Sequence, residues 1–282
     1  CYTPEDTDEQ LTRMIRSMRS ILVSAKPATR KRLVFHILGK KLKRLNSHLG
    51  HLQRKGEIPR DIKVYRGVTD LVPKERKVHG GGNLKKLEKD EVYVRFFLPS
   101  ILDKSVDKYL YLDTDTAVFS DLAAVYDQVL QGKYTLAAGV QNSSKCTMQK
   151  MVDLNDKRLK HLGIKPDDPC LSGGAFFVDR WRWVKENRTQ RWEHWIAENY
   201  KKKLYYLGCM PPQMIDFHNQ WEELPDTLLR DFKGHQCCPP KYSGSLLLNG
   251  QSSIVHPLKD IEDFGVFRRH LEVLDDSQGH EA

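Results

Sequence analysis

The sequence predicts a layered α/β protein. Short apolar runs typical of buried strands, such as 108–112 and 135–140, alternate with longer stretches in which apolar residues recur at helical spacing. This alternation is typical of α/β layers, in which ligands bind at the carboxyl ends of the strands. The 282 residues suffice to bury a sizeable core, and they contain no internal repeat and no low-complexity linker. We therefore expect one domain, residues 1–282.

The first expected helix shows how the elements are assigned. In residues 10–25 the apolar side chains recur at helical spacing, namely Leu11, Met14, Ile15, Met18, Ile21 and Leu22. The same criteria predict, in chain order, a strand at 32–37, a basic helix or loop at 40–54, a strand at 61–65, a glycine turn at 79–82, a helical segment from 91 to Pro99, a strand at 108–112, a helix at 121–131, and strands at 135–140 and 173–178. A tryptophan-rich helix at 181–200 follows, with Trp181, Trp192 and Trp195 expected in the core.

Composition and charge exclude several classes of protein. Hydrophobic residues make up 39% and charged residues 29% of the chain, which is typical of a globular protein and excludes a disordered one. No apolar run approaches the roughly 18 residues needed to span a bilayer. The net charge is +9, with basic clusters at 26–32, 40–44 and 201–203, but paired Cys/His ligands and interleaved basic and aromatic residues are missing, so we expect no nucleic-acid partner. Solvated helix faces account for most of this charge, and a phosphate-bearing donor or an anionic glycan acceptor could use the rest.

Cysteines, sequons and the first residue bear on the cellular compartment. The six cysteines (1, 146, 170, 209, 237 and 238) are too few and too irregular for a disulfide scaffold, and no CxxC pair indicates zinc. Adjacent Cys237 and Cys238 do not readily bridge to each other, and which cysteines pair stays open. Two sequons, Asn142-Ser143-Ser144 and Asn187-Arg188-Thr189, are consistent with a secretory-pathway protein. The sequence begins at Cys1 rather than Met, so an anchor or targeting segment upstream stays open.

Asp113-Thr114-Asp115 is the main candidate for a chemical site. The two carboxylates directly follow the apolar strand 108–112, and strand alternation would point both to one side with Thr114 turned away. A close carboxylate pair suits Mg²⁺ or Mn²⁺ bound together with phosphate oxygens. From the tripeptide alone, two other interpretations stay open. Both aspartates could be solvated in a turn, or Asp113 and Asp115 could be the nucleophile and general acid of a haloacid-dehalogenase-type Mg²⁺-dependent phosphatase, although the later acidic pair that such an enzyme needs on a strand is missing.

The order of several segments resembles glycosyltransferase family 8. These segments are Tyr93-Val-Arg95-Phe-Phe-Leu-Pro99, the run KYLYLDTDTAVFSDL at 108–122, Ser172-Gly173-Gly174-Ala175-Phe176-Phe177, and Ser253-Ile254-Val255-His256. The run from Pro211 to Gly234 is similar to the animal glycosyltransferase-8-domain-containing subgroup without a gap. The resemblance covers roughly residues 1–265 and leaves 266–282 as a C-terminal tail. It implies a GT-A fold, a Rossmann-like single domain with a mixed central sheet flanked by helices, whose first strand is cut short at the start of this sequence.

The resemblance also implies a set of donor-binding residues. Asp113, Asp115 and His256 would hold Mn²⁺, with Mg²⁺ as the alternative ion, and the ion would bridge the phosphates of a uridine diphosphate (UDP) sugar. The other residues placed with the donor are Tyr2, Thr3, Glu5 and Asp6 at the uridine, Thr114 beside the metal ligands, and Ser172, Gly173 and Gly174 at the sugar. Catalytic roles are implied for Arg95 and Lys259 beside the leaving diphosphate and for Gln213 near the sugar.

The implied activity is transfer of a hexosyl or pentosyl group, with retention of configuration, from a UDP-sugar to a hydroxyl of a glycan, protein or lipid-linked acceptor. The implied location is the Golgi or another secretory-pathway lumen. Three departures from the family pattern bear on this activity: Lys259 follows His256 early with no Pro–Trp after it, Pro211-Pro212-Gln213 replaces an Asp–Gln–Asp segment, and Ser172 replaces an asparagine. They leave open a non-catalytic relative that binds a UDP-sugar or a glycan without turnover.

Overall fold

The structure, a computed structural model, describes residues 2–3, 8–39, 42–56, 58, 62–65, 68–79, 87–141, 146–225, 228–231 and 254–256. The chain divides into two compact units. Unit 1 comprises residues 1–66, 112–128 and 224–282, and unit 2 comprises residues 67–111 and 129–223. Both units combine strands with helices, which agrees with the predicted α/β class. That they form a single domain stays a prediction.

A three-stranded parallel sheet begins unit 1. Its order is β1 (Tyr2–Thr3), β2 (Phe35–Gly39) and β3 (Ile62–Tyr65). Phe35 lies opposite Ile62, and Tyr2 lies opposite Leu38. The predicted strand at 32–37 therefore starts later, and the predicted strand at 61–65 is confirmed.

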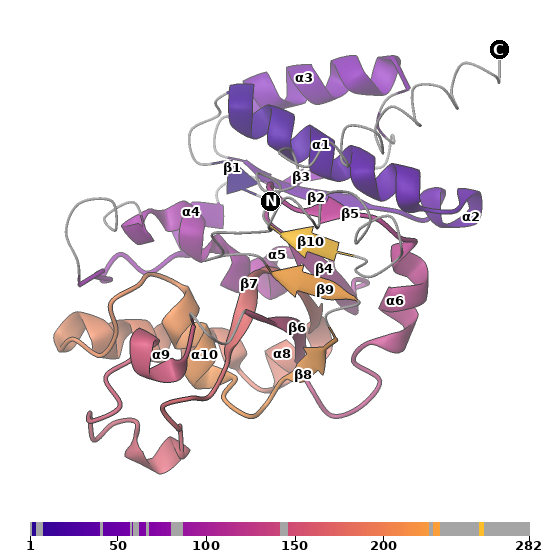
Figure 1. The fold of residues 1–282 in the computed structure, drawn as a ribbon. Coiled ribbons are helices and arrows are strands. Elements are labelled where there is room, and N and C mark those ends of the chain that lie inside the picture. The colour runs from indigo at the N-terminus through magenta and orange to yellow at the C-terminus, as the bar shows by residue number, and fades with distance from the viewer. Residues whose placement is uncertain are drawn as a thin grey trace, which may run out of the picture. The chain divides into compact units, whose positions relative to one another are not determined.

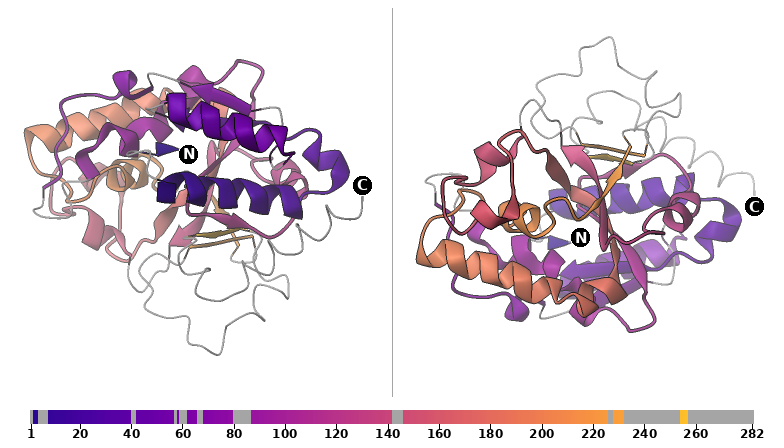
Figure 2. Two further views of the ribbon diagram at one scale, coloured as in Figure 1. Left: turned by 90° about the horizontal axis from the view of Figure 1, so that it is seen from above. Right: turned by 90° about the horizontal axis from the view of Figure 1, so that it is seen from below.

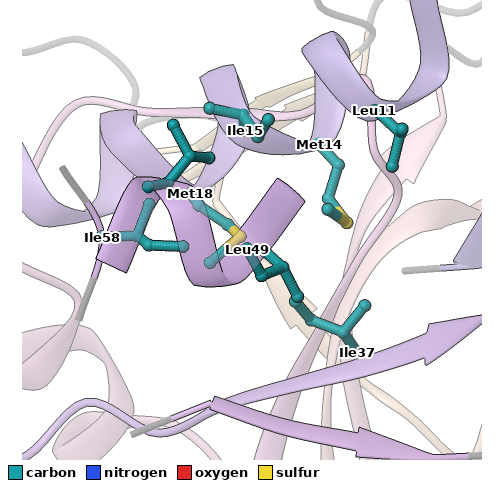
Figure 3. Close-up of a cluster of buried hydrophobic side chains, with 8 residues drawn as sticks. Leu11, Met14, Ile15, Met18, Ile37, Leu49 and Ile58 are labelled. Carbon is teal, nitrogen blue, oxygen red and sulfur yellow. The ribbon is translucent and has the colours of Figure 1, made fainter. Parts of the chain in front are cut away.

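Two amphipathic helices cover this sheet and form the core of unit 1. Helix α1 (Asp8–Ser24) and helix α3 (Leu42–Arg54) run side by side (Figures 1 and 2). Figure 3 shows the buried side chains that join them to β2, namely Leu11, Met14, Ile15 and Met18 of α1, Ile37 of β2, Leu49 of α3 and Ile58. The 10–25 helix is confirmed with its apolar face inward, and the helical alternative for 40–54 is the correct one.

Three further strands and two helices complete the described part of unit 1. Strand β10 (Ile254–His256) pairs in parallel with β9 (Leu229–Asp231) and antiparallel with β5 (Ala117–Val118). Helix α2 (Pro27–Arg30) follows α1, and α6 (Leu122–Gln128) follows β5. The mixture of parallel and antiparallel pairs is the mixed pattern that the family resemblance implies.

Unit 2 is built on an antiparallel strand pair with further strands beside it. Its strand order is β4 (Lys108–Leu112), β7 (Cys170–Asp179) and β6 (Leu136–Gln141), with β8 (Glu222–Leu224) also paired to β6. The helices, in chain order, are η1 (Val68–Leu71), α4 (Asp90–Tyr93), η3 (Val94–Phe96), α5 (Leu98–Ile101), α7 (Met148–Met151), η4 (Lys160–Leu162), α8 (Arg180–Lys185), α9 (Arg188–Lys201) and α10 (Met210–Asp216). Strand β7 is buried over nearly its whole length, so its apolar sequence reflects burial on both faces.

Stacked aromatic rings form the core of unit 2. The ring centroids of Phe96 and Trp192 are 3.9 Å apart, and both side chains are almost fully buried. Tyr93 and Trp183 pack around them. The short helices at 90–101 thus bury their aromatic side chains against α8 and α9, and Pro99 lies in the first turn of α5, where the missing N–H costs no hydrogen bond.

The predicted helix at 181–200 is two helices, and Trp181 is not in the core. The chain breaks at Asn187, whose φ of 52° is left-handed and ends the first helix. Trp183 is buried, whereas Trp181 is 60% exposed. Residues two positions apart lie on different faces of a helix, so the two tryptophans cannot share the buried face. The predictions for Trp192 and Trp195 are confirmed.

Some sequence predictions fall on residues outside the described part. Of the glycine turn at 79–82 only His79 is described, and the sequon at 142–144 lies wholly outside. In the second sequon, Asn187 is exposed, while Thr189 is buried and its hydroxyl bonds to Phe96 O. Within the described residues, no helix is long and apolar enough to span a membrane.

One disulfide lies beside the β6–β7 pair. It joins Cys146 to Cys170, two buried residues 24 positions apart, and Cys209 is buried as well. Cys170 begins β7 and lies opposite Gln141, so the bond ties the start of β7 to the chain that follows β6.

Replacing both Cys146 and Cys170 by serine should lower the free energy of unfolding. The expected loss is roughly 3 kcal/mol, because the bond closes a loop of intermediate length. Guanidinium unfolding followed by circular dichroism measures it. As a control, wild-type protein unfolded in a thiol reductant should lose the same amount, and an unchanged midpoint in reductant would contradict the assignment.

Candidate functional site

The Asp113–Asp115 segment is a turn and not a strand continuation. Strand β4 ends at Leu112, and the Thr116 N–H donates to the carbonyl of Asp113 at 3.2 Å. Strand alternation therefore does not set the directions of the two carboxylates, because the strand has ended and the chain forms a hydrogen-bonded turn. That both carboxylates point to one side stays a prediction. Asp113, Thr114 and Asp115 are all half-buried.

Helix α1 binds the residues that follow this turn. The Val118 N–H donates to Ser20 Oγ at 3.0 Å, and Ser24 Oγ donates to the Val118 carbonyl at 2.9 Å. Ser20 Oγ also donates to the Ser17 carbonyl at 2.7 Å. Ser20 and Val118 are fully buried, so these bonds fix β5 on α1 away from water.

Strand β10 binds the same residues from another direction. Ile254 lies opposite Val118, and Val255 lies opposite Ala117. The register, continued by one residue, sets the backbone of His256 opposite Thr116, next to Asp115. The pairing therefore brings the backbone of β10, which ends at His256, to the residues that directly follow the turn, all within unit 1.

The donor set fits Mn²⁺ or Mg²⁺ by chemistry, although no complete metal cluster is described. Among the described side chains, no three His, Cys, Asp or Glu residues form a metal-sized group, and the side chain of His256 is not among them. Two carboxylates and an imidazole suit Mn²⁺. Thr116 is fully buried, and within the described part of the chain its hydroxyl has no hydrogen-bond partner. A buried polar atom without a partner is the kind of group that a bound ligand can satisfy.

In unit 2, Arg95 joins two of the strands. Its Nη1 donates to the carbonyl of Gly173, and its guanidinium lies over the Tyr111 ring at 4.7 Å from the centroid. Arg95 thus belongs to η3 but lies against β7 and β4, and it is half-buried. The structure brings together two of the residues predicted for the site, Arg95 and Gly173.

Gly173 also accommodates helix α10, which carries Gln213. A Cβ at Gly173 would lie 3.3 Å from the Met210 side chain, so the missing side chain makes room for the first residue of α10. Gln213 lies one turn further along α10 and is 0% exposed. Both atoms of its amide lack a hydrogen-bond partner among the described residues. Leaving a buried amide without partners costs about 1–3 kcal/mol, which calls for an explanation.

A buried ion pair holds α10 on α9. Arg188 Nη1 donates to the Asp216 carbonyl at 3.0 Å and lies 3.3 Å from its Oδ2, and Arg191 Nε lies 2.6 Å from Oδ1. Burial raises the pKa of Asp216, and the two arginines act in the opposite direction. Pro211 and Pro212 lie in the first turn of α10, where proline is tolerated. The Pro–Pro–Gln departure therefore leaves a regular helix with Gln213 inside it.

The remaining predicted site residues are placed only in part. Ser172 and Gly174 lie in β7 with Gly173, and Ser172 is fully buried. Tyr2 and Thr3 lie in β1, but their side chains are outside the described part. Glu5, Asp6 and Lys259 lie outside it altogether.

Comparison with known proteins identifies the family. The model of glycosyl transferase family 8 matches residues 8–228, which is well over half of the chain. The chain belongs to glycosyl transferase family 8. This membership gives no support to the phosphatase interpretation of Asp113 and Asp115.

Relatives within this family are distant. The mouse protein "Glycosyltransferase 8 domain-containing protein 2" is 24% identical over 252 residues, covering 79% of this chain and 69% of the relative. The Arabidopsis thaliana protein "Probable galacturonosyltransferase-like 8" is 29% identical over 140 residues, 49% of this chain and 35% of the relative. The chain thus spans about a third of the length of that relative.

Solved structures show that the fold is the GT-A glycosyltransferase fold. The galactosyltransferase LgtC, in a crystal structure with donor and acceptor sugar analogs, matches with a TM-score of 0.63 at 14% identity. The match covers 94% of this chain and 93% of that one. The predicted GT-A fold, with its mixed sheet and flanking helices, is confirmed.

Several residues that shape the candidate site of this family 8 chain are not predicted by its sequence. Ser20 and Ser24 bind β5, Met210 fills the space beside Gly173, and Tyr111 stacks on Arg95. Serines on an amphipathic helix carry no signal of a distant partner. The alternation within β4 does place Tyr111 on the buried face, but it does not reveal the arginine.

Replacing Ser20 by alanine should destabilise the family 8 fold around the Asp113–Asp115 turn. The buried Val118 N–H loses its acceptor, which should cost about 1–3 kcal/mol in the free energy of unfolding. Ser24→Ala is the matched control on the same helix. Its loss should be smaller, because Ser24 is only half-buried and water can reach it. Chemical unfolding of both variants measures the difference, and equal losses would argue against a special role for Ser20.

Proposed function

We propose that this chain transfers a sugar, with retention of configuration, from a UDP-sugar to a hydroxyl acceptor on a glycan, protein or lipid-linked molecule. Asp113, Asp115 and His256 would hold Mn²⁺, with Mg²⁺ as the alternative. The observation that supports the proposal is the register of β10, in which Val255, the residue before His256, lies opposite Ala117 just after the turn of the two aspartates. Membership in family 8 supports the reaction class.

Each part of the donor has residues proposed for it. A bound divalent ion would act as a Lewis acid on the diphosphate, an effect worth several kcal/mol. Tyr2, Thr3 and Asp6 are proposed at the uridine, and Thr114 beside the diphosphate. Lys259 and Arg95 are proposed to stabilise the charge that develops on the leaving group.

The sugar is proposed to contact residues of β7 and α10. Ser172, Gly173 and Gly174 of β7 and Gln213 of α10 are the candidates. The buried amide of Gln213, which has no partner among the described residues, supports this placement, because sugar hydroxyls both donate and accept hydrogen bonds.

The proposed step conserves atoms and charge. The acceptor oxygen bonds to the anomeric carbon as the bond from that carbon to the β-phosphate oxygen breaks. Attack on the same face as the leaving group retains configuration, and the hydroxyl proton leaves on the departing diphosphate. No side chain of the described residues is proposed as a covalent nucleophile.

A non-catalytic relative that binds a UDP-sugar or glycan is the second candidate function. The observation that favours it is the set of departures from the family pattern at Ser172, Pro211-Pro212 and Lys259. It predicts binding of UDP with Mn²⁺ but no transfer and no donor hydrolysis. For either function we propose a secretory-pathway location such as the Golgi lumen.

Mn²⁺ and UDP together should raise the melting temperature of the wild-type chain, and Asp115→Asn should abolish the effect. A ligand at 100 times its dissociation constant stabilises the native state by about 2.7 kcal/mol. Asp127→Asn is the charge-matched control, because Asp127 is exposed on α6, outside the turn. The Asp127→Asn variant should show the same rise in melting temperature as the wild type. If the wild type shows no shift with both ligands present, the proposed donor site is wrong.

Gln213→Met should lower sugar transfer without lowering stability. The substitution removes an amide that has no partner among the described residues, so the free energy of unfolding should hold or rise, while kcat/KM should fall by about 100-fold if the amide binds the sugar in the transition state.

Asn199→Leu is the contrasting control for this prediction. Asn199 Oδ1 accepts from the N–H groups of Leu204 and Tyr205, and its Nδ2 donates to the Lys77 carbonyl. In this variant the free energy of unfolding should fall by roughly 3 kcal/mol, because the buried N–H groups of Leu204 and Tyr205 lose their acceptor. Calorimetric unfolding beside a UDP-release assay measures both quantities. A Gln213→Met variant that unfolds more easily at full activity would assign Gln213 to the core alone.

A further inference from the structure

Three consecutive lysines lie at the C-terminal end of α9 and have no part in the proposed transfer. Lys201 and Lys202 have side chains that are 70% and 80% exposed, and Lys203 is exposed as well. We call residues 201–206 the lysine turn. A lysine run of this kind is usually a solvated surface, so a role requires more than exposure.

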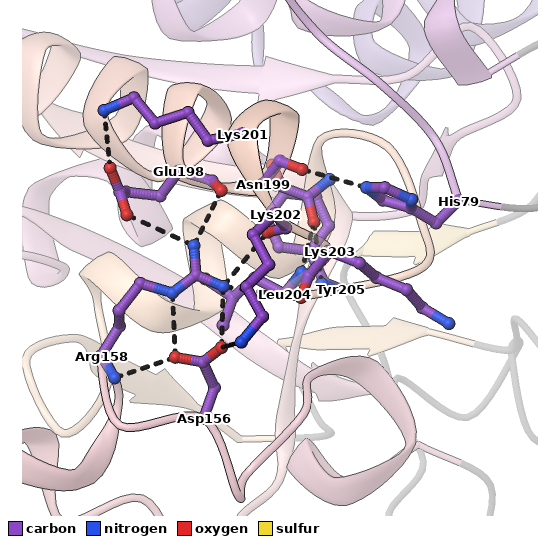
Figure 4. A network of polar contacts seen from close by, with 10 residues as sticks. All are labelled: His79, Asp156, Arg158, Glu198, Asn199, Lys201, Lys202, Lys203, Leu204 and Tyr205. Atoms are coloured by element: carbon purple, nitrogen blue, oxygen red, sulfur yellow. Dashed lines mark hydrogen bonds and ion pairs between the residues drawn. The ribbon is translucent and has the colours of Figure 1, made fainter.

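The backbone of the lysine turn is held from two sides. Asn199, which is 1% exposed, accepts hydrogen bonds from the N–H groups of Leu204 and Tyr205 at 2.8 and 2.9 Å. Arg158 donates to the carbonyls of Glu198 and Lys202, at 2.8 and 3.1 Å (Figure 4). Carbonyls at a helix end normally lack partners, so Arg158 caps α9 and fixes the path of the lysines after it.

The acids of this network are already occupied. Asp156 forms a bidentate ion pair with Arg158, in which Nε donates to Oδ1 at 2.9 Å and Nη2 donates to Oδ2 at 2.8 Å. The hydrogen bond from Arg158 lowers the pKa of Asp156. Glu198 accepts from Lys201 at 3.0 Å and lies 3.3 Å from Arg158; these bonds, the one from Lys201 first, lower its pKa.

The lysines therefore keep an excess of positive charge. Lys202 comes no closer than 3.9 Å to Asp156, whose charge Arg158 already balances. Pairs as exposed as those of Lys201 and Lys202 contribute little to stability and exchange readily for another anion. Two more exposed lysines, Lys157 and Lys160, lie in the segment that also carries Arg158. A third, Lys77, is linked to the turn because its backbone carbonyl accepts a hydrogen bond from the Asn199 side chain.

An exposed aromatic ring lies within the positive surface. Lys203 Nζ is 3.7 Å from the centroid of the Tyr206 ring, and Tyr206 is 46% exposed. The sequence showed no alternation of basic and aromatic residues here, because the ring comes into contact with the lysine only through the fold of the turn. A ring face offers an apolar surface to the C–H groups of a sugar, while the lysines attract carboxylate or sulfate groups.

We propose that the lysine turn, with Lys157, Lys160 and Tyr206, binds an anionic glycan chain that carries carboxylate or sulfate groups. The occupied acids, the fixed backbone and the ring against Lys203 fit a polyanion of sugars. An anionic membrane would also attract the lysines, but for insertion the turn offers only a tyrosine ring beside a lysine. The proposal goes beyond the donor chemistry and concerns binding alone.

The test measures binding of a fluorescent heparin dodecasaccharide to the wild-type chain at physiological ionic strength, with no donor or metal present. In the variant Lys201→Gln/Lys202→Gln/Lys203→Gln the affinity should fall by about tenfold or more, since a lysine near a dense anionic surface contributes about 1 kcal/mol. The control is Lys26→Gln/Lys31→Gln/Arg32→Gln, three exposed cations of unit 1 with the same loss of charge. Its affinity should change by less than about twofold.

Further measurements identify the ligand chemistry. Tyr206→Leu should weaken binding of the dodecasaccharide but leave binding of linear polyphosphate unchanged, because only the sugar uses the ring. All variants have substitutions at exposed positions, and equal melting temperatures confirm that they fold. Equal loss in the two triple variants, or no loss in either, overturns the proposal. It is likewise overturned if the lysine-turn variant loses binding to phosphatidylserine vesicles while keeping dodecasaccharide affinity. Failure of the Mn²⁺ and UDP shift would leave this result untouched.

Discussion

The backbone of Val118 is the constraint on which the proposed metal site depends. Its N–H and carbonyl bond to two serines of α1, and its strand pairs with β10. An exposed loop of two aspartates would have to be ordered by the ion, at the cost of its conformational entropy. Here β4 precedes the turn and the buried strand β5 follows it, so the backbone of the turn is fixed at both ends without a ligand.

Unit 2 shows two buried amides with opposite environments. Asn199 uses its oxygen and nitrogen in three hydrogen bonds to backbone groups, which makes it part of the fold. Gln213 is equally buried, but its amide finds no partner in the described part of the chain. Natural proteins tolerate such a cost mainly where the group serves another purpose. The contrast supports a ligand for Gln213 better than burial or proximity alone would.

Local patterns predicted most elements, and the errors have physical causes. Periodicity located α1, β4, β6 and β7, because each buries one face or both. It failed at Asn187, since apolar spacing cannot reveal a left-handed residue that splits a helix and leaves Trp181 exposed. The residue types of Asp113 and Asp115 were enough to predict a candidate metal site. The turn that carries them, and the bonds from Ser20 and Ser24 to the strand after it, were not predicted. Hydrogen bonds between residues nearly a hundred positions apart leave no trace in one sequence.

The departures from the family pattern differ in their physical consequence. Two prolines replace residues in the first turn of α10, yet the helix forms and Gln213 keeps its buried place. Ser172 keeps a polar group on β7 but shortens its reach compared with an asparagine, which alters hydrogen bonding while leaving the strand intact. These changes remove polar side chains at positions 211 and 212, keep a shorter one at position 172, and leave β7 and α10 intact. Because the fold tolerates all of these changes, their effect falls on hydrogen bonding at the candidate site and not on the stability of its framework.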